Sequence, residues 1–153
     1  MAVYDYRGPV AAAVVGAKIG GAWAAWLPLA DDLARRVRDD PPEVDVVTWV
    51  TTPARRVRAR GGDHAELLAR AVGRAIGVPV ARLLDAEADG EDRDRYRPSI
   101  SLPGSQVLLV DDVVTTGATA VRAATALRAA GADRIVLAVV ARAGSHPLTS
   151  GRT

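Results

Sequence analysis

The 153-residue chain contains no cysteine and no phenylalanine, and it has one lysine and two histidines. Without cysteine it can form no disulfide, use no thiolate nucleophile and build no cysteine-based zinc site. The histidines, His64 and His146, lie far apart in the sequence, which argues against a transition-metal centre. The apolar run Val10–Ile19 is interrupted by Lys18 and is too short to cross a bilayer, and the first residues do not resemble a secretory signal. We therefore expect a cytoplasmic protein without membrane contact.

The chain does have enough apolar residues for the core of one domain, since about half of its side chains are apolar. Its net charge is only +2, and its basic residues are almost all arginine. The densest basic patch, here called the arginine cluster, consists of Arg55, Arg56, Arg58 and Arg60. Taken alone, this cluster fits a ligand phosphate, a solvated loop or nucleic acid. Nucleic acid is the least favoured, because a broad basic face with aromatic residues is not evident.

Apolar periodicity and turn residues predict that strands alternate with helices. The expected strands are Val44–Val50, Val78–Leu84, Val107–Val110 and Arg134–Val140. The expected helices are Gly8–Lys18, Trp23–Arg38, the segment between Asp63 and Gly77, and Ala120–Ala130. This alternation is typical of a doubly wound α/β fold with a mainly parallel sheet. A single domain, 1–153, is expected, with a helical hood region 1–42, an α/β core 43–142 and a tail 143–153.

Some local features can be predicted more finely. Asp63 and Glu66 have the spacing of a capping box at a helix start. The segment Asp85–Gly104 is polar and rich in turn residues, so it is expected to form a long loop. In the last helix, we expect the sheet-facing side chains to be Val121, Ala124 and Leu127.

The most informative stretch is Val107–Thr119, Val-Leu-Leu-Val-Asp-Asp-Val-Val-Thr-Thr-Gly-Ala-Thr. It begins as a wholly apolar strand, and Asp111 and Asp112 follow at the carboxyl end, where open α/β sheets bind their ligands. Two adjacent acids have no packing use there, but they suit the vicinal hydroxyls of a sugar. The turn Thr115–Thr119 then leads into a helix, whose amino terminus offers unpaired N–H groups to a phosphate. The residues therefore predict a cradle for a ribose 5-phosphate.

Val107–Thr119 closely resembles the phosphoribosyl-pyrophosphate (PRPP) binding motif of the type I phosphoribosyltransferases. It contains neither a Walker P-loop nor a Gly-x-Gly-x-x-Gly sequence. A looser similarity to the ComF-like (competence protein F) branch covers roughly residues 6–142 and includes Tyr6–Pro9, Arg60–Gly61, Ala65–Ala71 and Ala130–Ala132. The resemblance implies the α/β fold of this family with a small N-terminal helical hood, and it suggests a homodimer.

The resemblance also implies roles for individual residues. Asp111 and Asp112 would act as the catalytic pair and hold the ribose hydroxyls. The 5′-phosphate would be bound by Val113, Val114, Thr115, Thr116, Gly117, Ala118 and Thr119. The pyrophosphate would be bound by Thr51, Thr52, Arg55, Arg56 and Arg58. Lys18 is a candidate substrate contact, although a lysine at a helix end more often interacts with the helix dipole.

The cofactor implied is Mg²⁺, held mainly by PRPP oxygens and only through water by Asp111 and Asp112. The reaction implied is displacement of pyrophosphate from C1 of the ribose by a nitrogenous acceptor, which the sequence does not identify. The protein would contribute charge stabilisation and positioning. Thr115 stands where some purine-specific members carry an aspartate base, so the motif itself supplies no general base.

Two segments differ from the family pattern. Gly62–His64 replaces an aromatic residue followed by Asp or Asn and then Gln. The segment Asp85–Asp92 is acidic where the family usually has a basic lid, and an acidic lid would oppose a bound pyrophosphate. His64 is expected to be a surface histidine. The tryptophans Trp23, Trp26 and Trp49 are expected to pack in the core or hood.

Two functions stay open at this stage. The first is a Mg²⁺-dependent phosphoribosyltransferase that uses PRPP and a nitrogenous acceptor. The second is a non-catalytic module that binds PRPP or nucleotides, associated with competence. The intact cradle fits both, and the two altered segments favour the second.

Overall fold

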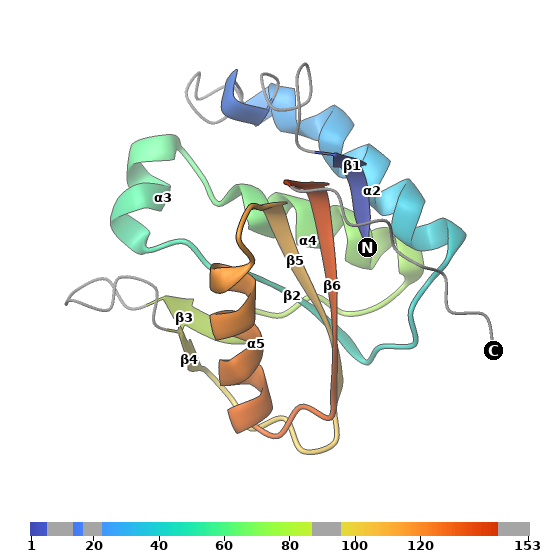
Figure 1. Ribbon diagram of the computed structural model, residues 1–153, viewed down its shortest axis with the longest axis vertical. Coiled ribbons are helices and arrows are strands. Elements are labelled where there is room, and N and C mark those ends of the chain that lie inside the picture. Colours follow the sequence, from blue (N-terminus) through green and yellow to red (C-terminus); the bar gives the residue numbers. More distant parts are fainter. Residues whose placement is uncertain (6–13, 17–22, 87–95, 144–153) are drawn as a thin grey trace.

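A computed structural model of the protein describes residues 1–5, 14–16, 23–86 and 96–143. Its elements, in chain order, are β1 (Ala2–Asp5), the 3₁₀ helix η1 (Trp23–Trp26), α2 (Leu27–Asp39), β2 (Val46–Trp49), α3 (Ala54–Arg60), α4 (His64–Ile76), β3 (Leu84–Ala86), β4 (Tyr96–Pro98), β5 (Gln106–Val114), α5 (Ala118–Ala129) and β6 (Arg134–Arg142) (Figure 1). Within the described ranges, no helix is long and apolar enough to cross a membrane.

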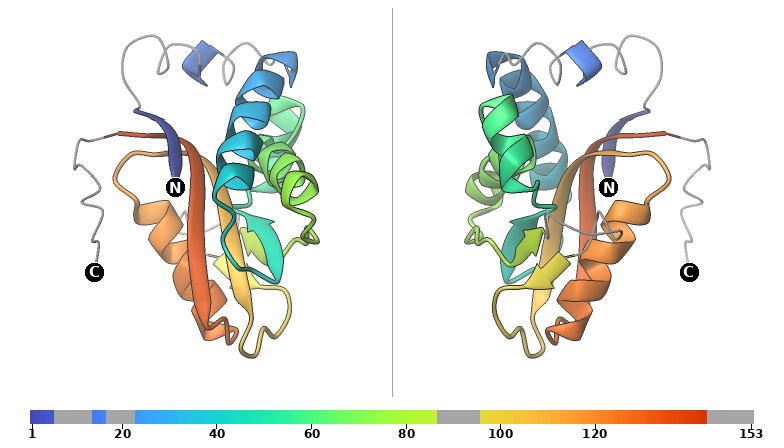
Figure 2. Two further views of the ribbon diagram at one scale, coloured as in Figure 1. Left: turned by 90° about the vertical axis from the view of Figure 1, so that its right-hand side faces the viewer. Right: turned by 90° about the vertical axis from the view of Figure 1, so that its left-hand side faces the viewer.

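Four parallel strands form the central sheet, in the order β1-β6-β5-β2. Helices α2 and α4 cover one face of this sheet, and α5 covers the other (Figure 2). Successive residues of a strand point to opposite faces. Accordingly, Leu108 and Val110 of β5 join the core under α2 and α4, whereas Val107 and Leu109 join the core under α5. The expected α/β fold with a mainly parallel sheet is therefore confirmed.

The edge strand β1 was not expected from the sequence. It pairs in parallel with β6, with Ala2 opposite Val139. The hydroxyl of Tyr4 on β1 donates a hydrogen bond to Asp32 on α2, so the strand is also tied to the helical layer. A strand of four residues carries little periodic signal of its own, and its identity depends on the neighbouring strand that it joins.

The helical part of the hood region agrees with the sequence where it is described. Trp23–Trp26 forms a 3₁₀ turn, and α2 follows with Pro28 in its first turn, a position where the missing N–H costs nothing. Leu33 and Val37 of α2 are buried, and Arg35 is exposed. Of the expected helix Gly8–Lys18, only Val14–Gly16 is described, and it is helical.

The interpretation of residues 78–104 needs correction. The expected strand Val78–Leu84 contributes only one bridge to the main sheet, between Val80 and Val47. The expected loop Asp85–Gly104 instead contains part of a two-stranded antiparallel sheet, in which β3 pairs with β4. Leu84, the first residue of β3, is fully buried in the core under α5, and this burial anchors the small sheet.

The expected elements of the central stretch are present and longer than predicted. Strand β5 continues through both aspartates to Val114, and α5 begins at Ala118. The expected sheet-facing positions of α5 are partly wrong, because Val121 is 65% exposed while Ala120, Ala123, Ala126 and Leu127 are buried. The last strand, β6, includes the whole predicted segment Arg134–Val140.

Candidate functional site

A hollow of about 250 Å³ lies at the carboxyl ends of β2 and β5. These strands are neighbours, with Trp49 opposite Val110, so the loops that follow them meet at one edge of the sheet. The hollow is lined mainly from four parts of the chain, namely the β2–α3 loop, the start of α4, the β3–β4 sheet, and the end of β5 with the start of α5.

The paired acids Asp111 and Asp112 are part of the lining of this hollow. Both are half-buried near the end of β5. Asp111 Oδ1 accepts the amide of Asp112 at 2.8 Å, and Asp112 Oδ1 accepts the amide of Val113 at 2.6 Å. Each carboxylate is thus oriented by a hydrogen bond from the backbone amide of the next residue. Two adjacent carboxylates in a partly open hollow are suited to accepting hydrogen bonds from hydroxyl groups.

The turn after β5 forms the amino end of α5. Gly117 is the N-cap residue and has φ of 81°, a left-handed conformation that favours glycine. The Thr116 hydroxyl oxygen accepts the Ala118 amide at 3.3 Å, and both Thr115 and Thr116 are exposed. No acidic residue lies in the first turn of α5. The helix terminus therefore keeps its positive character and can bind an anion.

The residues predicted to bind the 5′-phosphate do not all line the same hollow. Thr119 and Val113 line the hollow with the two aspartates. Val114, Thr115, Thr116 and Gly117 line a second hollow of about 760 Å³, between α5 and the strands β1 and β6.

The arginine cluster lies on a helix, α3, and not on a loop, and its described side chains, Arg56 and Arg58, are exposed. Arg56 lines the hollow that contains the aspartates. Arg58 is exposed on the same helix and is not among the lining residues. The backbone of Arg55 belongs to α3, and its side chain lies outside the described part of the structure.

The loop that connects β2 to α3 contributes Thr51 and Thr52 to the hollow. Thr51 is 3% exposed, and its hydroxyl has no hydrogen-bond partner among the described residues. The amide of Thr52 donates to Asp63 Oδ2 at 3.1 Å, and its hydroxyl donates to Asp63 Oδ1 at 3.4 Å. The loop is therefore held by an acid from another element.

Asp63 is the site residue that the sequence interpretation assigned only to capping. It is the N-cap residue of α4, as predicted, although its carboxylate makes no capping hydrogen bond of standard geometry. Instead its Oδ2 accepts the indole Nε1 of Trp49 at 3.2 Å as well as the Thr52 amide. Burial raises the pKa of Asp63, and hydrogen bonds from Thr52 and Trp49 and the amides of Ala65 and Glu66 only partly offset this.

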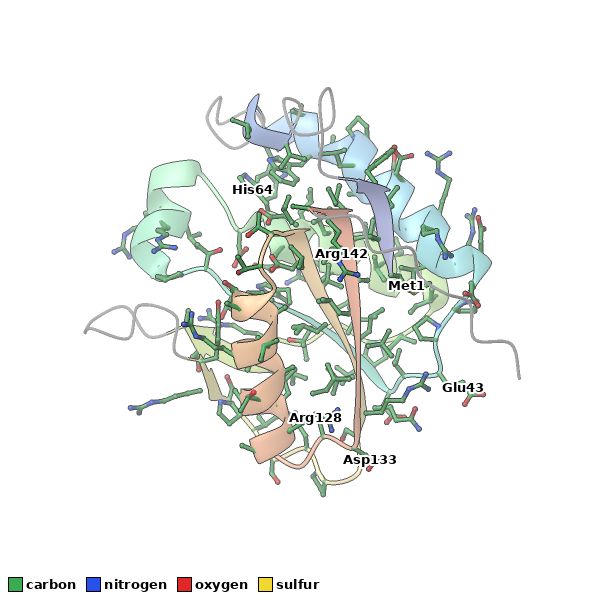
Figure 3. All side chains as sticks on the ribbon, viewed as in Figure 1. Met1, Glu43, His64, Arg128, Asp133 and Arg142 are labelled. Atoms are coloured by element: carbon green, nitrogen blue, oxygen red, sulfur yellow. The ribbon has the colours of Figure 1, made fainter. Side chains whose placement is uncertain are left out.

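His64 is not a surface residue, which corrects the sequence interpretation. It is 4% exposed at the first position of α4, and Figure 3 shows it where α4 begins, below η1. Its imidazole stacks on Trp26 with ring centroids 4.4 Å apart and lies 5.7 Å from the ring of Trp23. Trp26 and Trp49 are buried, as expected, whereas Trp23 contacts this histidine but is 40% exposed.

Two predicted features fall outside the described residues. These are Lys18 and most of the acidic segment, from Glu87 to Asp92. Ala86 and Tyr96, the described residues on either side of 87–95, line the hollow.

No group of three or more His, Cys, Asp or Glu side chains that could hold a metal ion occurs within the described residues. The pair Asp111 and Asp112 fits a hydrated Mg²⁺ whose remaining ligands come from a bound phosphate compound, because Mg²⁺ prefers oxygen ligands and retains several waters.

Comparison with known proteins agrees with this geometry. The profile of the phosphoribosyl transferase domain matches residues 24–150. The orotate phosphoribosyltransferase of Sulfurovum sp. (strain NBC37-1) is 31% identical over 116 residues, which are 76% of this chain and 51% of that protein. The ribose-phosphate pyrophosphokinase of Thermococcus kodakarensis is 34% identical over 67 residues, which are 44% of this chain and 24% of that protein.

Among solved structures, the purine phosphoribosyltransferase of Pyrococcus horikoshii Ot3 superposes with a TM-score of 0.54 and 21% identity, covering 78% of this chain and 75% of that chain. The chain spans about a quarter and about half of the lengths of the two curated relatives. The family profile, by contrast, covers most of the chain, including both strands and both loops of the hollow. The protein belongs to the phosphoribosyl transferase domain family.

Proposed function

We propose that this protein binds PRPP in the hollow between β2 and β5 and transfers the phosphoribosyl group to a nitrogenous acceptor, releasing pyrophosphate. One observation carries the proposal. The hollow joins the paired carboxylates and Thr119 of the β5–α5 segment to Thr51, Thr52 and Arg56 of the β2–α3 segment, although these segments are far apart in the sequence. Family membership supports phosphoribosyl transfer in general.

In this proposal the two segments bind opposite ends of PRPP. Asp111 and Asp112 accept hydrogen bonds from the ribose hydroxyls, and Thr119 and the amides at the start of α5 bind the 5′-phosphate. Thr115, Thr116 and Gly117, which line the second hollow, are proposed as further phosphate contacts. The loop Thr51–Thr52 and Arg56 bind the pyrophosphate. Arg55 and Arg58 of α3 are proposed as further pyrophosphate contacts, and Lys18 stays a predicted substrate contact.

Mg²⁺, when bound to PRPP, would neutralise charge on the departing pyrophosphate. The protein's own residues position the ribose and the pyrophosphate, and Arg56 provides positive charge where the leaving group separates. Asp111 and Asp112 stabilise positive charge that develops on the ribose ring. The homodimer, the cytoplasmic location and the link to competence remain predictions from the sequence.

A second function is favoured by one specific observation. The carboxyl group of Asp63 lines the same hollow as the proposed pyrophosphate contacts, so an acid lies where a dianion would bind. Repulsion between this carboxylate and the pyrophosphate would oppose the close positioning that transfer requires. The alternative is therefore a regulatory PRPP-binding or nucleotide-binding module.

Calorimetry with PRPP, with and without Mg²⁺, tests the shared part of both functions. We expect micromolar binding that requires Mg²⁺ and that weakens about tenfold or more, about 1.4 kcal/mol, in the double variant Asp111→Asn/Asp112→Asn. The matched control is Asp39→Asn/Asp40→Asn, which removes an adjacent pair of exposed acids at the end of α2. Wild-type protein that does not bind millimolar PRPP would rule out the transferase and the PRPP-binding form of the module.

Pyrophosphate release separates the two functions. The protein is incubated with PRPP, Mg²⁺ and a panel of nitrogenous acceptors, and free pyrophosphate is measured. Release that requires one acceptor supports the transferase. Intact binding without release from any acceptor supports the module.

A further inference from the structure

The hydrogen bonds of Asp63 converge on one loop of the candidate site. Its carboxylate accepts the Thr52 amide and the Trp49 indole N–H on Oδ2, at 3.1 and 3.2 Å, and the Thr52 hydroxyl on Oδ1 at 3.4 Å. Trp49 is the last residue of β2, and Thr52 lies in the loop that follows. One side chain at the start of α4 thus holds the chain just where it leaves the sheet.

We infer that Asp63 is a positioning residue that fixes the β2–α3 loop for pyrophosphate and at the same time lowers the affinity of that loop by its negative charge. The inference rests on the proposed function, because it assigns the loop Thr51–Thr52 to pyrophosphate. The three hydrogen bonds and the shared hollow carry it.

The positioning role follows from the absence of regular structure between β2 and α3. A loop lacks the regular backbone hydrogen bonds of strands and helices, so its conformation is fixed by other contacts. Thr52 uses both its amide and its hydroxyl on Asp63, so its backbone orientation depends on this acid. Loss of the acceptor would leave a partly buried amide and indole N–H without partners, and the loop would relax to satisfy them.

The opposing role follows from charge. Asp63 shares the hollow with Arg56 from α3, His64 from α4, Tyr96 from β4, and Asp111 and Asp112 from β5. Arg56 is the one cationic arginine among the lining residues described, against three carboxylates. A pyrophosphate bound there would raise the proton affinity of Asp63 further, because like charges disfavour the ionised form.

Asparagine can separate the two roles. Its side-chain oxygen can take the place of Oδ2 and accept from Trp49 and Thr52, while its amide can donate to the Thr52 hydroxyl oxygen. Asp63→Asn therefore keeps the hydrogen bonds and removes the charge. Asp63→Ser keeps a favourable N-cap residue for α4 but is too short to reach the loop. Both variants are neutral, so their difference reports the hydrogen bonds alone.

The experiment measures Mg²⁺-pyrophosphate affinity for the wild type and both variants by calorimetry between pH 5 and pH 8. We expect Asp63→Asn to bind about ten times more tightly than Asp63→Ser at every pH. We also expect the ratio of Asp63→Asn to wild-type affinity to exceed one at pH 8 and to fall toward one at lower pH. Protonation of pyrophosphate itself cancels in that ratio. Equal affinities of the two neutral variants would overturn the positioning role, and a ratio that does not change with pH would overturn the charge role.

A second readout does not depend on ligand. The indole ¹⁵N–¹H signal of Trp49, assigned with Trp49→Phe, should shift as pH falls in the wild type and stay constant in Asp63→Asn, because only the wild type loses an anionic acceptor. In Asp63→Ser it should resonate at the position of an unbonded indole. An unchanged Trp49 signal in Asp63→Ser contradicts the inference. If the wild type binds neither PRPP nor pyrophosphate but the indole signal behaves as expected, the proposed function fails while the structural role of Asp63 stands.

Discussion

At the scale of single residues, Gly62, which lines the candidate site, lies against the ring of Trp23. A Cβ atom built on Gly62 would lie 2.2 Å from Cζ3 and 2.7 Å from Cη2 of the Trp23 ring. The indole therefore occupies space that any larger residue at position 62 would fill. Because Trp23 lies on η1 and also lies near His64, this contact connects the helical hood to the start of α4.

Gly62→Ala should therefore destabilise the protein through this contact. Overpacking of this kind typically costs about 1–3 kcal/mol, and urea denaturation of the variant measures it. In a background of Trp23→Ala the same glycine substitution should cost almost nothing, because the ring that it meets is gone. Additive effects of the two substitutions would show that the contact does not constrain the fold.

At the scale of elements, α5 has a buried side and an exposed side that differ sharply. Leu127 is fully buried in the core with Leu83, Leu84 and Leu109, whereas Val121 is 65% exposed. We expect Leu127→Ala to lower the free energy of unfolding by about 2–5 kcal/mol. Val121→Ala on the same helix should change it by less than about 0.5 kcal/mol. Denaturant titration of both variants checks the assignment, and a larger effect at Val121 would contradict it.

Helix α5 and the strand and turn before it show which structural features the sequence predicts and which it does not. The strand before α5 and the glycine turn that leads into it were predicted correctly, because each has a distinct local chemistry. The orientation of α5 was predicted wrongly at Val121, because the buried face is made largely of alanines such as Ala120 and Ala123. Alanine buries little apolar surface, so the apolar pattern alone favours the larger valine as the core residue.

The other features that the sequence does not predict depend on contacts between segments far apart in the chain. Strand β1 is defined by pairing with β6, and β3 by pairing with β4, at separations that no single-segment pattern reveals. In the site, Asp63 was assigned to capping because its sequence neighbours fit a capping box. Its actual partners, Trp49 and Thr52, are brought to it by the packing of α4 beside β2.

At the scale of the whole molecule, the carboxyl group of Asp63 links folding to pH. Burial raises its pKa in the folded protein, so the charged form is less favourable there than in the unfolded chain. A group of this kind contributes stability that is fully present below its unfolded pKa of about 4 and that is lost as pH rises through its folded pKa. At neutral pH the wild type therefore carries the cost of a partly buried anion, offset in part by the hydrogen bonds to Thr52 and Trp49.

Asp63→Asn has no proton to lose at this position and keeps the hydrogen-bonding pattern. The difference in free energy of unfolding, variant minus wild type, should consequently increase as pH rises from about 4 toward neutrality. Urea denaturation across this range measures the difference, and Asp39→Asn, at the exposed end of α2, controls for the loss of one negative charge. A difference that is constant or that decreases with pH would mean that the anion is not disfavoured in the fold. The negative charge of Asp63 would then not destabilise the folded protein, and its position beside the proposed pyrophosphate site would carry no cost in stability.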